Sequence, residues 1–92
     1  MKNNVLKIHE NDNVGIATQP VKKGTPLIMD GRLLFEAAED VAIGHKIALV
    51  TIANGKNIYR YGEPIVEATR TIKQGEWVHI HNTQPIPGDL KG

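Results

Sequence analysis

The stretch IKQGEWV, residues 72–78, shows the pattern that decides the fold: an apolar residue three positions before a glycine and another three positions after it. The pattern occurs three more times, as VKKGTPL (residues 21–27), VAIGHKI (residues 41–47) and IANGKNI (residues 52–58). A glycine adopts a positive φ without steric cost, so each copy predicts a tight turn whose flanking apolar residues anchor it to a core. Four such turns within 92 residues predict a compact, mostly β domain of short strands.

Apolar alternation and β-branched residues between the turns place the strands. We expect eight strands, separated by breaks rich in Gly, Asn, Asp and Pro. Residues 37–41 add at most one helical turn, because the helix formers in FEAAED are too few to stand alone. The expected strands are residues 4–8, 14–17, 25–27, 33–36, 46–51, 58–61, 64–68 and 76–82.

The length and charge of the chain fit one small cytoplasmic domain. A chain this short buries only about 60–65% of its unfolded surface, so its core is small. The 11 basic and 10 acidic residues are scattered and Phe35 is the only phenylalanine, so the basic stripe with stacking aromatics of a nucleic-acid binder is missing. No apolar run approaches the ~18 residues of a membrane helix, and the N-terminal segment lacks an apolar signal region. We expect neither a nucleic-acid nor a membrane partner.

Missing residue types exclude several catalytic classes. The chain has no Cys, which excludes disulfides, thiolate metal sites and a cysteine nucleophile. It also has no Ser, which excludes a serine nucleophile. The Gly-Lys pair at residues 55–56 lacks the spacing of a phosphate-binding loop. Because so small a core can hardly wall a water-excluding pocket, we expect the chain to work as part of something larger.

Two histidines, His79 and His81, are separated by a single residue within the last expected strand. Alternation along a strand would place both imidazoles on one face, roughly 6.5–7 Å apart at the backbone. They could hold a metal ion, bind an anion, relay a proton, or merely lie on a solvated sheet face. A closed zinc site would need two further ligands from elsewhere.

Three other places carry candidate polar residues. His45 and Lys46 follow a predicted glycine turn, where they form either an anion contact or simply a solvated turn. Glu63 can act as a general acid or base or as a ligand, or it can only cap its turn. Asp12 is expected to stabilise the turn that precedes the second strand.

Four stretches, NDNVGIA, IGHKIAL, YGEPIVEAT and GEWVHIHN, occur in this order along the chain. In that combination the chain resembles the N-terminal SAF domain of altronate and galactarate dehydratases, and it is similar to the free-standing small subunit of sulfolactate sulfo-lyase. The resemblance spans about residues 5–82. It implies a compact β-clip fold for residues 1–82. The two prolines and two glycines within residues 83–92 predict a tail or linker after that domain.

The resemblance also implies lyase chemistry, the removal of water or sulfite from the carbon next to a hydroxyl in a 2-hydroxy acid. In that family a larger catalytic domain or subunit carries most of the machinery, usually with a divalent metal such as iron, so this chain is expected to be inactive alone. The residues carried over are His79, His81 and His45 as catalytic groups, Lys46, Glu63 and Asn82 as substrate contacts, and His79 and His81 as metal ligands.

The residue types fit these roles. A substrate carboxylate or sulfonate needs a cation such as Lys46 or protonated His45, and a leaving hydroxide must be protonated or metal-bound, which suits an imidazole or a divalent ion. The alternative is a SAF module that binds a carbohydrate acid or another ligand through the same residues and carries out no chemistry.

Overall fold

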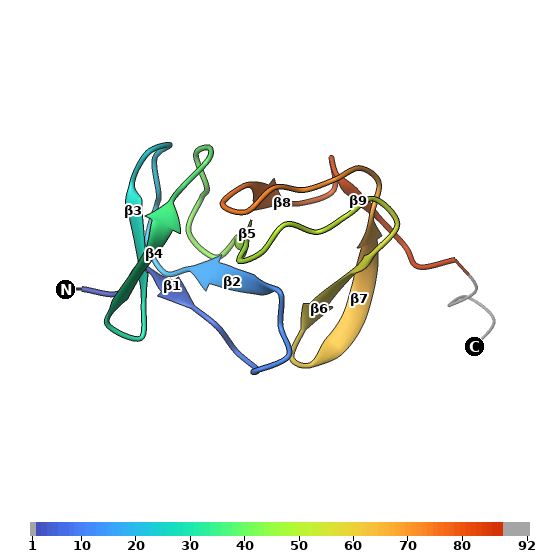
Figure 1. The fold of residues 1–92 in the computed structure, drawn as a ribbon, viewed down its shortest axis with the longest axis horizontal. Coiled ribbons are helices and arrows are strands. Elements are labelled where there is room, and N and C mark those ends of the chain that lie inside the picture. The colour runs from blue at the N-terminus through green and yellow to red at the C-terminus, as the bar shows by residue number, and fades with distance from the viewer. Residues whose placement is uncertain (1, 88–92) are drawn as a thin grey trace.

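The computed structural model describes residues 2–87, which form nine short strands and no helix (Figure 1). A four-stranded sheet with the order β1-β2-β5-β8 lies in the middle of the molecule, with the β3-β4 hairpin at one end and the β6-β7-β9 sheet towards the other. All pairs are antiparallel. The strands are β1 (Val5–Leu6), β2 (Val14–Ala17), β3 (Pro26–Met29), β4 (Arg32–Glu36), β5 (Lys46–Ala48), β6 (Asn57–Arg60), β7 (Glu63–Ala68), β8 (Trp77–Val78) and β9 (Thr83–Gln84).

The all-β class and the positions of the eight expected strands are confirmed. Strands β1, β5 and β8 are shorter than expected, and the other five are as long as expected or one residue longer. No helical turn forms at residues 37–41, where at most one was expected. Ala37 N–H donates to the Thr25 carbonyl and Ala38 N–H to the Gly75 carbonyl, both at 2.9 Å, so distant loops take the donors that a helix would use. Strand β9 falls in the expected tail and pairs with β7, and residues 88–92 of that tail lie outside the described residues.

The four glycine turns share one pattern of backbone hydrogen bonds. The φ angles of Gly24, Gly44, Gly55 and Gly75 are 87°, 83°, 84° and 89°, which confirms the prediction of left-handed turns. Each glycine N–H donates a hydrogen bond of 2.8 Å to the carbonyl of a buried alanine elsewhere in the fold. The N–H of that alanine donates back to the carbonyl of the residue that follows the glycine. A small side chain lets the two backbones approach. The alanines are, in the same order, Ala37, Ala17, Ala68 and Ala48.

The structure also repeats internally with an offset of 31 residues, so that residues 21–48 correspond to residues 52–79. Both segments run from a glycine turn through a hairpin to a second glycine turn. The hairpins turn on residue pairs with two positive φ angles, Asp30–Gly31 (54° and 74°) and Tyr61–Gly62 (58° and 76°), as two-residue hairpins prefer. In each segment the apolar residues before the two glycine turns pair with each other, Val21 with Val41 and Ile52 with Ile72.

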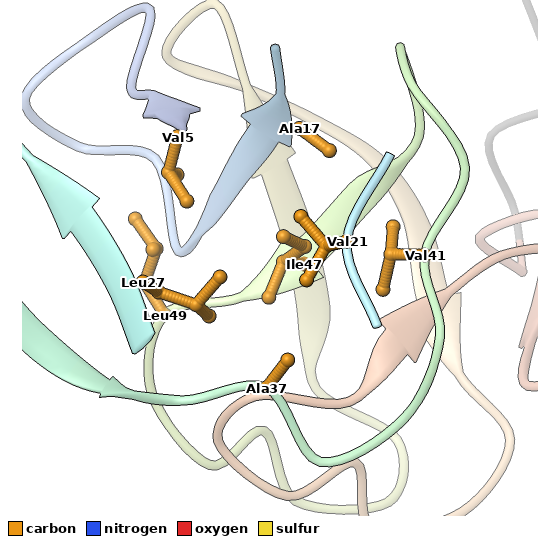
Figure 2. Packing of buried hydrophobic residues seen from close by; sticks show 8 residues of the cluster. All are labelled: Val5, Ala17, Val21, Leu27, Ala37, Val41, Ile47 and Leu49. Carbon is orange, nitrogen blue, oxygen red and sulfur yellow. The ribbon is translucent and has the colours of Figure 1, made fainter. Parts of the chain in front are cut away.

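The repeat gives the domain two small cores instead of one. Leu27 and its counterpart Ile58 are both fully buried, but the first packs in one cluster and the second in the other. Burying a side chain of this size contributes about 1.5–3 kcal/mol. Figure 2 shows the first cluster, whose side chains converge from β1, β2, β3, β5 and the segments between strands. Its members are Val5, Ala17, Val21, Leu27, Ala37, Val41, Ile47 and Leu49.

Three asparagine side chains clamp the strand that follows a glycine turn. Each side-chain amide donates to the carbonyl two residues after the glycine and accepts from the N–H four residues after it, over 2.7–2.9 Å. The clamp holds the first residues of that strand in addition to its pairing with a partner strand. Asn4 binds Pro26 and Ile28, Asn13 binds Asn57 and Tyr59, and Asn82 binds Trp77 and His79.

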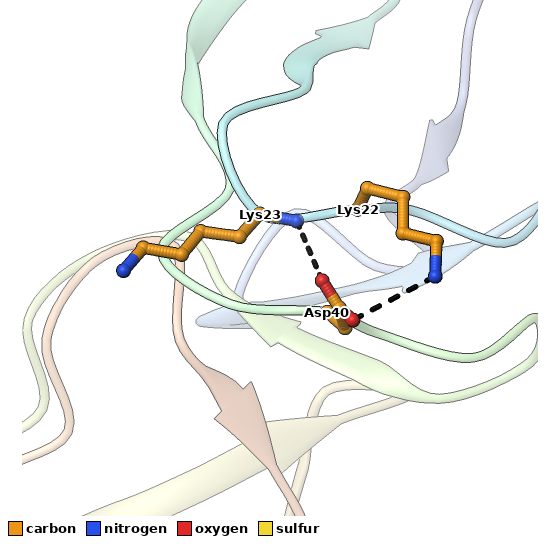
Figure 3. A network of polar contacts seen from close by, with 3 residues as sticks. All are labelled: Lys22, Lys23 and Asp40. Carbon is orange, nitrogen blue, oxygen red and sulfur yellow. Dashed lines mark hydrogen bonds and ion pairs between the residues drawn. The ribbon is translucent and has the colours of Figure 1, made fainter.

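Asp40 ties the first glycine turn to the loop before the second (Figure 3). Its carboxylate accepts from the Lys23 backbone N–H at 2.8 Å and lies 3.8 Å from Lys22 Nζ. The ion pair is exposed, so it contributes at most about 1 kcal/mol. The backbone hydrogen bond is therefore the main structural contribution of Asp40.

Replacing Gly75 by alanine should destabilise the fold more than the same change at Gly55. Both residues have a positive φ, which costs an L-residue about 1–2 kcal/mol. A Cβ at Gly55 meets nothing within 4 Å, whereas one at Gly75 would lie 2.9 Å from the Glu36 carbonyl oxygen. Urea unfolding of both variants measures the difference, and equal losses would contradict this account of the Gly75 turn.

Candidate functional site

His45, Trp77, His79 and His81 form one cluster of aromatic rings. Trp77 is stacked with His79, their ring centroids 5.0 Å apart and their planes 12° apart, and His81 lies against Trp77 at 4.8 Å. His45 lies 4.9 Å from His79, and its Nδ1 accepts a 3.0 Å hydrogen bond from Trp77 Nε1. The structure thus brings the three predicted histidines together around a single indole.

The two histidines near the C-terminal end lie in a turn rather than a strand. Strand β8 ends at Val78 because the Asn82 side chain occupies the backbone N–H of His79 at 2.9 Å. The turn is closed by Asn82 N–H and Thr83 Oγ1, which both donate to the His79 carbonyl. The prediction that a strand at residues 76–82 places both imidazoles on one face is therefore wrong, although both rings contact Trp77.

Trp77 is the cluster residue that sequence reasoning missed. It lies in β8 opposite Ile47 of β5, and both sides of its backbone are fixed. Its N–H donates to Glu39 Oε2 and its carbonyl accepts from Asn82 Nδ2, each over 2.8 Å. The available signal was its place as the only tryptophan, between a predicted glycine turn and the two histidines.

Positive charge gathers beside the cluster. Lys46 lies in β5 opposite Val78, and no described carboxylate lies within ion-pair distance of it. Partial burial and the neighbouring Arg60 charge lower the pKa of Lys46. Desolvation and the nearby charges of His45, Lys46 and His81 lower the pKa of His79 below its ordinary value of 6.5. His79 is therefore neutral at pH 7, where it can accept a proton or a hydrogen bond.

Two predicted site residues, Asn82 and Glu63, present no side chain to the cluster: Asn82 is buried and Glu63 lies on another hairpin. Asn82 is only 1% exposed, and both ends of its amide bind backbone, so the geometry gives it a positioning role. Glu63 is the exposed first residue of β7, next to the turn of the β6-β7 hairpin. That hairpin turns at the lower edge of Figure 1, whereas β8 lies in the upper half. Direct substrate contact by either residue stays a prediction.

Residues 3–85 match the family described as the altronate/galactarate dehydratase SAF domain. The chain belongs to this family. Altronate dehydratase of Bacillus subtilis (strain 168) is 40% identical over 86 residues, which are 94% of the chain and 17% of that protein. For altronate dehydratase of Escherichia coli (strain K12) the identity is 42% over 85 residues, 92% of the chain and 17% of that protein.

A shorter relative matches the SAF domain over most of its own length. The (2R)-sulfolactate sulfo-lyase subunit alpha of Chromohalobacter salexigens is 31% identical over 70 residues, which are 76% of the chain and 74% of that subunit. The chain thus spans less than a fifth of the altronate dehydratases that it matches but about three quarters of this subunit. The same module therefore occurs both inside long proteins and as a short subunit.

The described part of the SAF domain does not contain a complete metal site. No three of its His, Asp or Glu side chains are arranged to hold one ion. His45 Nδ1 is already occupied by the Trp77 indole, which leaves His79 and His81 as a pair of imidazoles. The described residues also enclose no pocket. A metal ion would need ligands from another part of the protein or from a partner.

Asn82→Ala should loosen the histidine turn as well as destabilise the domain. It leaves the His79 N–H and the Trp77 carbonyl without their partner, which costs about 1–3 kcal/mol. Asn4→Ala is the matched control, because it removes the same clamp from β3, away from the cluster. Both variants should lose similar stability in urea, but only Asn82→Ala should shift the NMR resonances of His79 and His81. Unshifted resonances would show that the clamp does not position the turn.

Lys46→Gln should raise the pKa of His79. The substitution removes one of the positive charges that disfavour the imidazolium, while desolvation still keeps the pKa below 6.5. Because folding favours neutral His79, its contribution to stability is present above pH 6.5 and is lost as the pH falls through the folded pKa. NMR titration of the His79 ring proton measures the shift. Lys56→Gln, on an exposed turn, is the control, and an equal shift there would contradict the local cause.

Proposed function

We propose that this SAF domain supplies part of the active site of a lyase that removes water, or sulfite, from a hydroxy acid. The observation that carries the proposal is the cluster itself: three imidazoles on one indole, beside a lysine without an acidic partner among the described residues. Support for the reaction class comes from the relatives, which are named altronate dehydratase, galactarate dehydratase and sulfolactate sulfo-lyase.

The side chains of the cluster suit an elimination from a 2-hydroxy acid. Lys46 can bind the substrate carboxylate or sulfonate, because it carries a positive charge in a partly desolvated position. Neutral His79 can accept the proton that leaves the carbon next to the carboxylate. Once protonated, the same imidazole or its neighbour His81 can give a proton to the departing hydroxide, so the proton balance of the reaction is met within the cluster.

A larger catalytic domain or subunit completes the site in this proposal. The cluster is open to solvent, since His81 is exposed and the neighbouring Ile80 is 81% exposed at the tip of the turn. The altronate dehydratases that the chain matches are several times longer than it, which leaves ample chain for such a domain. We therefore propose that the chain is inactive alone and acts in the cytoplasm with its partner.

We further propose that a divalent metal, such as iron, is held mainly by that larger part. As an alternative to their acid–base roles, His79 and His81 can contribute two imidazole ligands, and neutral imidazole is a common ligand for such metals. In that arrangement the larger part supplies the base and the acid. The metal would supply Lewis-acid polarisation of a substrate oxygen. The described residues leave the remaining ligands to the partner.

Affinity capture with the tagged chain, followed by assays of the captured complex on altronate, galactarate and sulfolactate, tests the proposal. Turnover should appear with the complex and be absent from the isolated chain. Turnover by the isolated chain at ordinary enzyme rates would refute the accessory role. A stable complex that converts none of these hydroxy acids would refute the lyase assignment.

In the active complex, His79→Gln should lower kcat by about 10²- to 10⁴-fold, the usual contribution of a general acid or base. His9→Gln is the control, because His9 packs against Gly62 outside the cluster. The alternative function, a module that binds the substrate without chemistry, predicts a raised KM with unchanged kcat for His79→Gln. Steady-state kinetics on both variants separate the two functions.

A further inference from the structure

We infer that Trp77 is the positioning residue of the cluster, and that its indole holds His45 as a hydrogen-bond donor to the substrate rather than as a base. The inference makes His45 a hydrogen-bond donor and leaves His79 as the base, and this division of roles rests on the proposed function. The geometry behind it, however, belongs to the isolated domain. One hydrogen bond and one pair of stacked rings carry it.

The hydrogen bond between Trp77 and His45 fixes where the imidazole proton lies. An indole Nε1–H can only donate, so the nitrogen that it meets at 3.0 Å, His45 Nδ1, must be the unprotonated one. Neutral His45 then carries its proton on Nε2. With Nδ1 engaged, the other ring nitrogen is left as an N–H donor. Such a donor suits a hydroxyl or carboxylate oxygen of a hydroxy acid, whereas a base would need a free lone pair.

Trp77 is itself held firmly enough to impose this arrangement. Its backbone N–H is bound by Glu39 and its carbonyl by Asn82, and its position in β8 pairs it with Ile47 of the central sheet. Part of its ring packs against the first core cluster. The indole is therefore fixed from the backbone outward, as the supporting residues of an active site need to be.

The same indole orients the second histidine. The His79 ring lies nearly parallel to the Trp77 ring, with 12° between the planes, so stacking limits its rotation. His79 makes no hydrogen bond with the indole N–H, which is taken by His45. Trp77 thus leaves His45 with Nε2–H as its free donor. It leaves both ring nitrogens of His79 available to a substrate or partner.

NMR of the ¹⁵N-labelled 92-residue chain at neutral pH tests this directly. We expect a coupling through the hydrogen bond between Trp77 Nε1 and His45 Nδ1, and the correlation pattern of an Nε2–H imidazole for His45. Trp77→Phe keeps an aromatic ring but removes the donor, so the coupling should vanish and the Nδ1–H form of His45 should gain population. Phe35→Leu alters an aromatic residue packed on the same core and should leave His45 unchanged. A protonated Nδ1 in the wild type, or unchanged His45 signals in Trp77→Phe, would overturn the inference.

Kinetics of the complex with its partner add a readout that a merely structural role would not move. Trp77→Phe should lower kcat about 10- to 100-fold, as loss of a supporting contact does. The double variant Trp77→Phe with His45→Gln should be little worse than His45→Gln alone, because phenylalanine keeps a ring for His79 to stack on and the lost indole N–H acts only on His45. Additive losses would overturn the positioning role. If the NMR result holds while no complex shows lyase activity, the proposed function fails and the positioning of His45 by Trp77 stands.

Discussion

The reciprocal pair of hydrogen bonds between a glycine turn and a buried alanine is the contact on which the rest of this structure depends. Strands of two to six residues provide few ladder hydrogen bonds of their own. The four turn-alanine pairs join segments that no long strand connects, and the left-handed glycine is what allows each turn to present its N–H inward. Both small cores are closed by these pairs. The histidine cluster depends on one of them, because the Gly75 turn places Trp77 beside β5.

The sequence predicts the parts of this fold that depend on neighbouring residues in the chain. A glycine with an apolar residue three positions before it and another three positions after it indicates a tight turn, so all four turns and the strands beside them are predictable. No helical turn forms at residues 37–41 because the N–H groups of Ala37 and Ala38 bind carbonyls elsewhere in the chain, a contact that depends on the assembled fold. Strand β8 is shorter than expected for a local reason: the side chain of Asn82, three residues further on, takes the His79 N–H that a strand partner would bind. The apolar alternation used to place the strands contains no sign of either contact.

Asp12 makes both kinds of contact, one that its local sequence predicts and one that depends on the assembled fold. Its expected role in the turn before β2 is confirmed, because its carboxylate accepts from the His9 N–H at 3.1 Å. The same carboxylate also accepts from the N–H groups of Tyr61 and Gly62, about fifty residues further on. Burial alone would raise the pKa of Asp12, but these three hydrogen bonds and nearby His9 lower it below its ordinary value. For the candidate site, likewise, the residue types could be predicted, but the organising Trp77 could not.

The 31-residue repeat has a consequence for how the chain reaches its native state. Its two segments are interlocked, because the Gly75 turn of the second binds Ala48 of the first and β8 completes a sheet begun by β1 and β2. Neither segment can therefore form its full set of contacts while the other is unfolded. Domains dominated by such distant pairings fold slowly, on the order of milliseconds to seconds. The aromatic cluster, built on the last strands of the chain, can be completed only after both segments have met.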